Sequence, residues 1–303
     1  MMEIDPKRLA FLLAVARNGS ILAAADALHL TPSAVSQQVS ALEREQGVLL
    51  LDRGPRGVTL TPGGRILVET AESIERELIE ARSRLVETQE DVTGTVAIGA
   101  FQTVISGLLA PRLAELHAEL PGISITLRDG TTARLPRMLR TAEVDLIILD
   151  RELDDSTPPH TADVPFLDEP WRLVAPQGTT AELGPAEIAK LPWLGVASVG
   201  ASVRAVERAR ASLGVSTPPV HGYDDFQTAL ALVAAGQGIT LLPDLVLQQG
   251  LPEGVVVIDR PGLGSRHLTI RHRATRREPS GATEAVIGAL GRLVREAEPG
   301  EYL

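Results

Sequence analysis

The chain has 303 residues, 44% of them hydrophobic, with six histidines, no cysteine and a formal net charge of −10. Its length predicts two or three domains, and the lack of cysteine excludes disulfides and thiolate metal sites. The histidines lack a metal-ligand spacing such as HExxH, no apolar run approaches the ~20 residues of a membrane span, and the N-terminus lacks a signal peptide's apolar core. We therefore expect a globular, cytoplasmic protein with no metal, no cofactor and no membrane partner.

Two helices are predicted before residue 30. The first spans residues 6–18, has apolar residues at helical spacing, and is ended by Gly19 in the left-handed conformation. The second spans residues 21–28, where Ser20 caps the start and several alanines allow close packing.

A third helix is predicted from Pro32, which suits the first helical position, with Thr31 as its cap. Val35, Val39 and Leu42 fall on one face, and short hydrogen-bonding side chains fall on another. The short connection of residues 29–31 makes the pair a candidate helix-turn-helix, whose Ser and Gln side chains suit phosphates and base edges. An ordinary helix pair with outward serines is the alternative. The candidate DNA contacts are Thr31, Pro32, Ser33, Ser36, Gln37 and Ser40.

Two short strands, residues 49–51 and 58–60, are predicted around the tip Arg53-Gly54-Pro55-Arg56-Gly57. In a winged helix-turn-helix such a tip lies along the DNA backbone or minor groove, so Arg53 and Arg56 are candidate backbone contacts. The alternative is a solvated turn. Residues 1–60 hold six basic and six acidic side chains, which predicts weak long-range steering and a modest salt dependence of binding.

The longest helical pattern runs from residue 62 to about residue 90, and at 1.5 Å per residue it would reach about 40 Å. Its apolar residues alternate at spacings of four and three, which is the seam of a heptad repeat and predicts a coiled-coil dimer. The alternative is an amphipathic helix lying on its own domain. The predicted dimer contacts are Leu67, Ala71, Ile74, Leu78, Ala81 and Leu85.

After residue 91 the pattern predicts alternating strands and helices, which is typical of α/β units. Strands 95–98, 124–127 and 146–149 alternate with helices 104–119 and 134–141. A second series places strands at 172–175, 194–197, 220–222 and 239–242 and helices at 185–189, 201–213 and 226–235. Strand 268–271 and helix 283–296 have no partner strands of their own, so we assign them to the first unit. Two lobes result, with crossings near residues 162–168 and 260–267.

One ordered pattern runs through the first 65 residues. Its residues are Phe11, Ser20, 23–25, Leu28, 31–39, Leu42, Glu43, Gly47, 50–53, Arg56 and 60–64. This pattern resembles that of the LysR-type transcriptional regulators. Leu51 stands where that family usually has Phe, and Gly63 where it often has Ala; both are packing changes.

The resemblance implies a multi-domain chain. Residues 1–60 would form a mostly helical winged helix-turn-helix DNA-binding domain, and 61–91 a coiled-coil linker helix for dimerisation. Residues 92–303 would form a two-lobed α/β effector domain like periplasmic binding proteins, with lobe I at about 92–163 and 267–303 and lobe II at about 164–266. The implied partners are promoter DNA, a small-molecule effector, further copies in a dimer or tetramer, and RNA polymerase.

Ligands of open α/β sheets bind beyond the carboxyl ends of the strands, here between the lobes. Hydroxyls, an amide and helix N-termini predict a small carboxylate effector, but Asp224 and Asp225 would repel an anion, so a neutral or cationic effector stays open. Each of these residues is alternatively an ordinary helix cap. The candidate effector contacts are Ala100, Phe101, Gln102, Thr103, Thr131, Thr132, Ser198, Ser202, Asp225 and Phe226.

Two other functions are alternatives to that of a ligand-responsive regulator. An enzyme on the α/β part is disfavoured, because the sequence lacks a GxSxG elbow, a GxxxxGK[ST] loop and a GxGxxG motif. A constitutive or architectural DNA-binding repressor would keep the dimer but bind no effector. We predict a sequence-specific regulator that is not an enzyme and has no catalytic residues.

Overall fold

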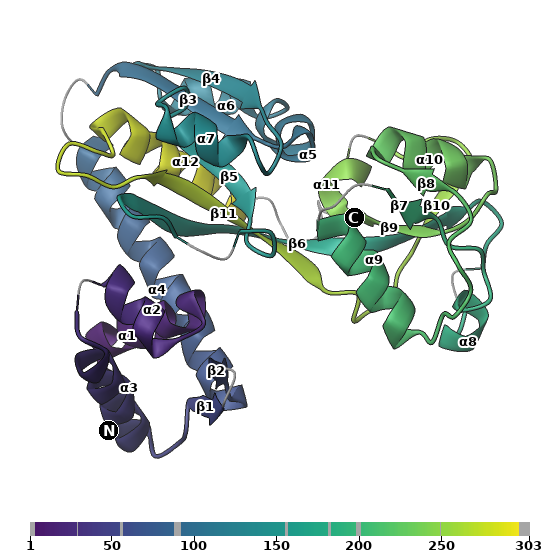
Figure 1. Ribbon diagram of the computed structural model, residues 1–303. Coiled ribbons are helices and arrows are strands. Elements are labelled where there is room, and N and C mark those ends of the chain that lie inside the picture. The colour runs from purple at the N-terminus through teal and green to yellow at the C-terminus, as the bar shows by residue number, and fades with distance from the viewer. Residues whose placement is uncertain are drawn as a thin grey trace.

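The computed structural model describes residues 4–28, 30–54, 57–87, 92–154, 157–180, 183–197, 201–248 and 250–296. A small N-terminal helical domain is joined by one long helix to two lobes, and a pair of long strands connects the lobes (Figure 1).

The N-terminal domain contains three helices whose ends the sequence specifies. They are α1 (Pro6–Asn18), α2 (Ile21–Ala27) and α3 (Pro32–Gln46). Side chains of Asp5, Ser20 and Thr31 cap their starts, and left-handed glycines at positions 19 and 47 end α1 and α3. The apolar faces of the three helices form one core. The predicted helix 6–18 and the start of the third helix at Pro32 are confirmed, whereas the helix predicted at 21–28 ends one residue earlier, at Ala27.

The wing is shifted from its predicted place. Strands β1 (Leu51–Gly54) and β2 (Gly57–Leu60) pair antiparallel, with Leu51 opposite Leu60 and Gly54 opposite Gly57. The prediction of residues 49–51 as the first strand was therefore wrong by a few residues. Leu50 is instead buried in the core, where it holds the chain between α3 and the wing.

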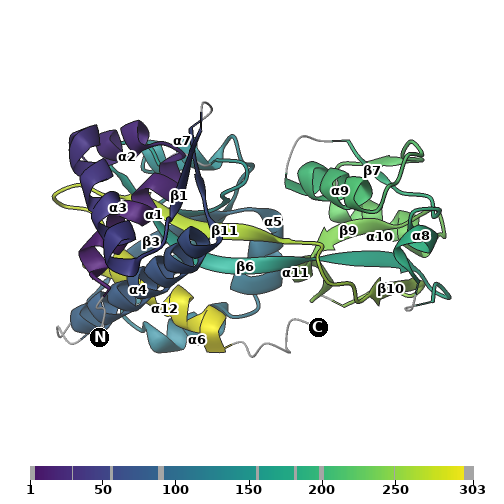
Figure 2. The same ribbon diagram turned by 90° about the horizontal axis from the view of Figure 1, so that it is seen from below.

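Helix α4 (Pro62–Glu87) begins directly after the wing. The Thr61 hydroxyl accepts from the Gly64 N–H at 3.0 Å and donates to the Leu49 carbonyl oxygen at 2.7 Å. A Cβ atom on Gly64 would overlap the Leu50 carbonyl oxygen, so only glycine fits this approach of helix and wing. Helix α4 then packs against α1 and α12 (Figure 2).

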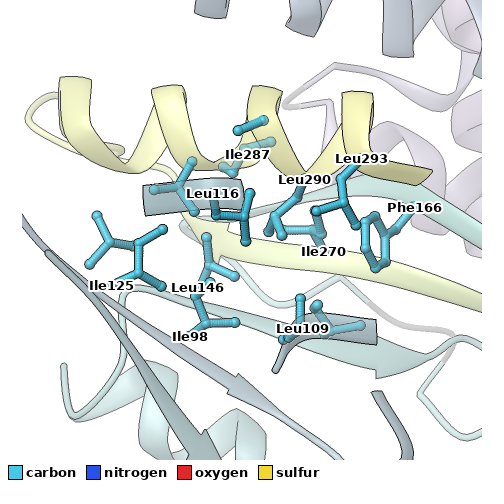
Figure 3. Close-up of a cluster of buried hydrophobic side chains, with 14 of the residues drawn as sticks. Ile98, Leu109, Leu116, Ile125, Leu146, Phe166, Ile270, Ile287, Leu290 and Leu293 are labelled. Atoms are coloured by element: carbon cyan, nitrogen blue, oxygen red, sulfur yellow. The ribbon is translucent and has the colours of Figure 1, made fainter. Parts of the chain in front are cut away.

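The first lobe is built on a mixed sheet. Strand β3 (Gly94–Ala100) lies parallel between β4 (Ile123–Asp129) and β5 (Leu146–Asp150), and β11 (Ser265–Arg273) joins antiparallel to β5. Its helices are α5 (Gln102–Val104), the π-helix η1 (Ile105–Leu109), α6 (Leu113–Glu119), α7 (Leu135–Arg140) and α12 (Gly281–Glu296). Leu290 and Leu293 of α12 pack on Ile98, Leu146 and Ile270 of the sheet (Figure 3).

The second lobe is built on the C-terminal half of β6 (Thr161–Pro176). This half pairs with β9 (Thr240–Pro243) and β10 (Val255–Ile258). A separate parallel pair, β7 (Gly195–Val196) and β8 (Gly222–Tyr223), lies in the same lobe. The helices are α8 (Pro185–Ile188), α9 (Ala201–Ser212), α10 (Phe226–Ala234) and α11 (Asp244–Leu247).

Strand β6 differs most from the sequence prediction. We predicted a strand only at residues 172–175 and a crossing at 162–168, but β6 is one strand of 16 residues. It pairs with β11 from Thr161 opposite Arg273 to Pro170 opposite Ser265, with an irregularity between Leu268 and Thr269. Proline is rare inside strands because it lacks an N–H, but Pro165 lies at that irregularity, where a missing N–H is tolerated.

Three smaller differences concern helices and strands. The predicted helix 104–119 is divided into α5, η1 and α6, and α11 and β10 were not predicted.

Among the described residues no single helix is long and apolar enough to cross a membrane; α1 and α2 pass that test only as a pair bent by 113°.

We predict that Gly64→Ala lowers the free energy of unfolding by about 2 kcal/mol, because the added methyl group must displace the backbone at Leu50. Denaturant unfolding followed by circular dichroism measures this. The control is Gly291→Ala in α12. There the nearest atom would lie 3.6 Å from the added Cβ, so the change in the free energy of unfolding should be neutral or slightly stabilising. Equal stability of the two variants would contradict the close approach.

Candidate functional site

The outer face of α3 is polar and accessible. Val35, Val39 and Leu42 are fully buried against α1 and α2, so the opposite face of the helix points outward. Thr31, Pro32, Ser33 and Gln37 are exposed, whereas Ser36 and Ser40 are half-buried. Gln37 is therefore the long, uncharged side chain that this face presents to solvent.

Two contacts fix α3 in place. Thr31 Oγ1 accepts from the Ala34 N–H at 3.2 Å and lies 3.0 Å from Ser33 Oγ, so Thr31 serves as the helix cap. At the other end, Glu43 Oε1 accepts from the N–H groups of Leu50 and Leu51 at 2.9 and 3.2 Å. These two bonds tie the helix to the strand that opens the wing.

Arg53 lies within β1, opposite Val58, rather than on the tip where we had placed it. Gly54 pairs with Gly57, and Pro55 and Arg56 lie outside the described residues. The side chain of Arg53 is also outside the described part, so both proposed backbone contacts stay predictions.

The heptad seam of α4 is divided between two uses. Ala71 is buried in the N-terminal core of its own chain, and Leu67 and Ile74 pack against that core. Leu78 is 65% exposed and Ala81 is exposed, while the side chain of Leu85 is not described. The prediction that the whole seam faces a partner is therefore corrected for its first three residues, because α1 already covers them.

An ion pair locks α4 to α1. Arg17, only 14% exposed, donates to both carboxylate oxygens of Glu75, with Nη1 to Oε1 at 3.1 Å, and reaches Glu72 at 4.0 Å. A bidentate pair with low exposure is stronger than a typical surface pair. The N-terminal domain and the first half of α4 should therefore move as one body.

In the first lobe the structure brings the predicted effector residues together at the carboxyl ends of β3 and β4. The Gly130 N–H donates to the Ala100 carbonyl oxygen at 3.1 Å, which places residues 131–132 beside residues 100–103. Phe101 is half-buried and Gln102 is exposed at the start of α5, Thr131 is exposed, and Thr132 is half-buried. The side chain of Ala100 is fully buried and so offers a ligand only its backbone.

In the second lobe the starts of α9 and α10 follow the parallel strands β7 and β8. The Ala197 N–H donates to the Tyr223 carbonyl oxygen at 2.8 Å, which aligns the ends of both strands. Ser202 is half-buried near the start of α9, and Phe226 is half-buried at the start of α10. Ser198 lies outside the described residues.

Asp225 is the cap of α10. Its carboxylate accepts from the Thr228 N–H at 2.8 Å and from the Thr228 hydroxyl at 2.7 Å. These hydrogen bonds hold the pKa of Asp225 below its usual range, so the exposed side chain stays ionised. The helix-cap alternative therefore accounts for Asp225 without a ligand.

The Thr103 hydroxyl takes part in a buried network of hydrogen bonds that was not predicted from the sequence. Arg266 Nη2 donates to Thr103 Oγ1 at 2.9 Å, and Arg266 Nε donates to Glu169. Glu169 Oε1 also accepts from the Leu245 N–H at the start of α11, at 2.7 Å. Thr103 is thus buried and occupied, which corrects its prediction as an open effector contact.

This network joins both lobes at the long strands. Glu169 of β6 lies opposite Arg266 of β11, and Thr103 belongs to α5 of the first lobe. Leu245 belongs to α11, which follows β9 of the second lobe, and its side chain is buried in the core of the first lobe. Burial raises the pKa of Glu169 even though Arg266 opposes the shift. Nearby, burial also raises the pKa of Asp150, whose Oδ2 atom has no hydrogen-bond partner among the described residues. Glu169 and Arg266 are 97 positions apart in the chain, and no local pattern in the sequence predicts that they pair.

Two family models match the chain. The "Bacterial regulatory helix-turn-helix protein, lysR family" model matches residues 6–65, and the "LysR substrate binding domain" model matches residues 89–295. The chain belongs to the LysR family. It is accordingly a DNA-binding transcription regulator with an effector-binding domain, because the family consists of transcriptional regulators and not of enzymes.

Similar LysR-family proteins cover most of the chain. A hydrogen peroxide-inducible genes activator from Dickeya chrysanthemi is 28% identical and covers 82% of this chain and 82% of its own length. The nitrogen assimilation regulatory protein nac from Klebsiella aerogenes is 28% identical, with 78% of both chains covered. The solved structure of CrgA, a LysR-type regulator from Neisseria meningitidis, has a TM-score of 0.67 at 21% identity, covering 96% of this chain and 99% of CrgA. The CrgA likeness supports the same fold.

We predict that Glu169→Ala lowers the free energy of unfolding by about 3 kcal/mol or more, because it leaves the Arg266 guanidinium buried without its carboxylate. The neighbouring Asp168→Ala, which removes an exposed partner of His267, should change it by no more than about 0.5 kcal/mol. Urea unfolding of both full-length variants measures the difference. A loss at Glu169 no larger than at Asp168 would contradict the network.

Proposed function

We propose that this LysR-family regulator reads its operator through the exposed face of α3. The observation that carries the proposal is the accessible Gln37 on a helix fixed by the Thr31 cap and the Glu43 bonds. A rigid helix places a glutamine amide for bidentate contact with an adenine edge, with Ser33 beside it for phosphate or base contact. Ser36, Ser40 and Pro32 shape the same face, and Arg53 and Arg56 of the wing contact the DNA backbone.

Two copies of the chain would pair through the second half of α4. Leu78 and Ala81 continue the heptad beyond the part that α1 covers, and the exposed Leu78 has an apolar surface that a partner helix would bury. Pairing would present two reading heads to two half-sites, as a dimer or as a tetramer of two such dimers.

The effector would bind between the lobes. Gln102 and Thr131 of the first lobe would face Ser202 and Phe226 of the second, and Ser198 would complete that side. A small carboxylate suits the hydroxyls and amide, whereas the ionised Asp225 favours a neutral or cationic effector. Closure of the lobes on either ligand would alter the arrangement of the dimers on DNA, and so their contact with RNA polymerase in the cytoplasm.

The domain division that underlies this mechanism is the one proposed from the sequence. Residues 1–60 read DNA, residues 61–91 pair the copies, and residues 92–303 bind the effector. Lobe I comprises about 92–163 and 267–303, and lobe II about 164–266.

We predict that Gln37→Ala weakens binding to the upstream promoter DNA by about tenfold, because a bidentate base contact contributes ~1 to 3 kcal/mol of discrimination. Fluorescence anisotropy with promoter and scrambled duplexes measures the loss, which should fall mainly on the promoter. The matched control is Gln227→Ala, an exposed glutamine on α10. Equal promoter affinity of the two variants would contradict the proposed contact of Gln37 with DNA.

We predict that Leu78→Glu shifts the dimer toward monomer by at least about tenfold in dissociation constant, since a carboxylate would have to be buried in the seam. Analytical ultracentrifugation at micromolar concentration measures the shift. The control, Leu251→Glu, changes a 44% exposed leucine of the second lobe and should leave the association unchanged. A wild-type protein that is already monomeric would overturn the proposed seam.

A further inference from the structure

A cavity of about 360 Å³ lies in the first lobe, between α7 and the end of β11. Its walls are mainly apolar, with Leu139 and the rings of Pro136, Pro158 and Pro159. Proline rings bring no N–H group that would need a partner, so hydrocarbon can fill this space without leaving a donor unsatisfied. The volume falls within the ~300 to 1,000 Å³ of small-molecule sites.

The wall that carries Pro158 and Pro159 is held by hydrogen bonds. The Thr161 hydroxyl donates to the Pro158 carbonyl oxygen at 2.6 Å, and the Ala274 N–H donates to the His160 carbonyl oxygen at 2.7 Å. Thr157 Oγ1 donates to Asp163 at 2.9 Å. The cavity is therefore formed in advance, which reduces the ordering cost of binding.

Two arginines also line the cavity, and both are fully engaged. Arg271, 1% exposed, donates to Asp163 at 2.6 and 2.8 Å and to Asp154 at 2.7 Å. Arg273 donates to Asp145 and Glu278 and to two backbone carbonyls. Their charges are compensated, so they attract no further anion. Arg271 is almost fully covered, whereas the half-buried Arg273 offers a flat, fixed surface against which a planar group can stack.

Arg140 is different. It lines the same cavity from the last turn of α7, its side chain is exposed, and it makes no ion pair with any residue that the structure describes. The exposed His160 also lines the cavity. The cavity thus combines apolar walls with a single uncompensated guanidinium at its edge.

We propose that this cavity is a second ligand site, which binds a small, flat, apolar monoanion such as an aromatic carboxylate. The ring lies among the prolines and against the guanidinium of Arg273, and the carboxylate meets Arg140. One uncompensated cation selects one negative charge, and the apolar walls exclude strongly hydrated acids. The site is separate from the space between the lobes, so it does not depend on the effector contacts proposed above.

The cavity is also close to a contact between the lobes. Arg271 binds Asp154, and two residues earlier Glu152 binds Arg208 of α9 at 2.8 Å while its carbonyl oxygen accepts from Arg204. Arg271 therefore links the wall of the cavity, through Asp154, to a segment of the first lobe that is bound to α9.

The test is a calorimetric titration of the full-length protein with 1-naphthoate and, in parallel, with the uncharged 1-naphthamide. We expect Arg140→Gln to weaken naphthoate binding by about fivefold, the effect of losing a partly exposed ion pair. Arg140→Lys should retain most of the affinity. Arg137→Gln, an exposed arginine on the same helix, is the matched control and should bind like the wild type.

Three results would overturn the proposal: no naphthoate binding at millimolar concentration, equal binding of naphthoate and naphthamide by the wild type, or equal naphthoate affinity of the Arg140→Gln and Arg137→Gln variants. Binding that is weakened by Arg140→Gln alone supports it. Because both variants change exposed side chains, neither should impair folding, and unfolding curves check this.

Discussion

The antiparallel pairing of β6 with β11 is the constraint on which the effector domain depends. Both strands leave the first lobe side by side, and the far half of β6 then supplies the edges on which β9 and β10 assemble (Figure 2). A connection made of paired strands resists shear along the hydrogen bonds but permits twisting and bending. We therefore expect relative motion of the lobes to take the form of twisting or bending of this ribbon.

Buried charges mark the two ends of this ribbon. Near the second lobe Arg266 pairs with Glu169, and within the first lobe Arg271 pairs with Asp163. A buried ion pair costs desolvation, and apolar residues of similar size often stabilise a fold equally well. What a pair such as Arg266 and Glu169 adds is registry: a slip by one residue would leave two charges buried without partners. The register of the ribbon is thus specified by electrostatics as well as by its hydrogen bonds.

The N-terminal part could be predicted closely because its signals are local: Ser20, Thr31, Gly19 and Gly47 set helix ends within a few residues of themselves. The full length of strand β6 could not be predicted, because Pro165 and Pro170 interrupt the strand pattern in the sequence. The strand is formed by pairing with β11, which lies about 100 residues later in the chain. The heptad pattern of α4 predicted an apolar stripe correctly, but a stripe does not reveal what covers it, and α1 covers its first part. The network of Thr103, Glu169 and Arg266 was not predicted either, because contacts between residues far apart in the chain produce no periodic pattern in the sequence.

The bidentate pair of Arg17 with Glu75 and the contact of Gly64 with Leu50 make α4 a stiff extension of the reading head. A helix of 26 residues is about 39 Å long, so it acts as a lever. A tilt of only about 5° where α4 meets α12 would displace the wing end by about 3 Å, on the order of one base-pair step. Small rotations within the effector domain are therefore geometrically sufficient to move a recognition helix out of step with its half-site.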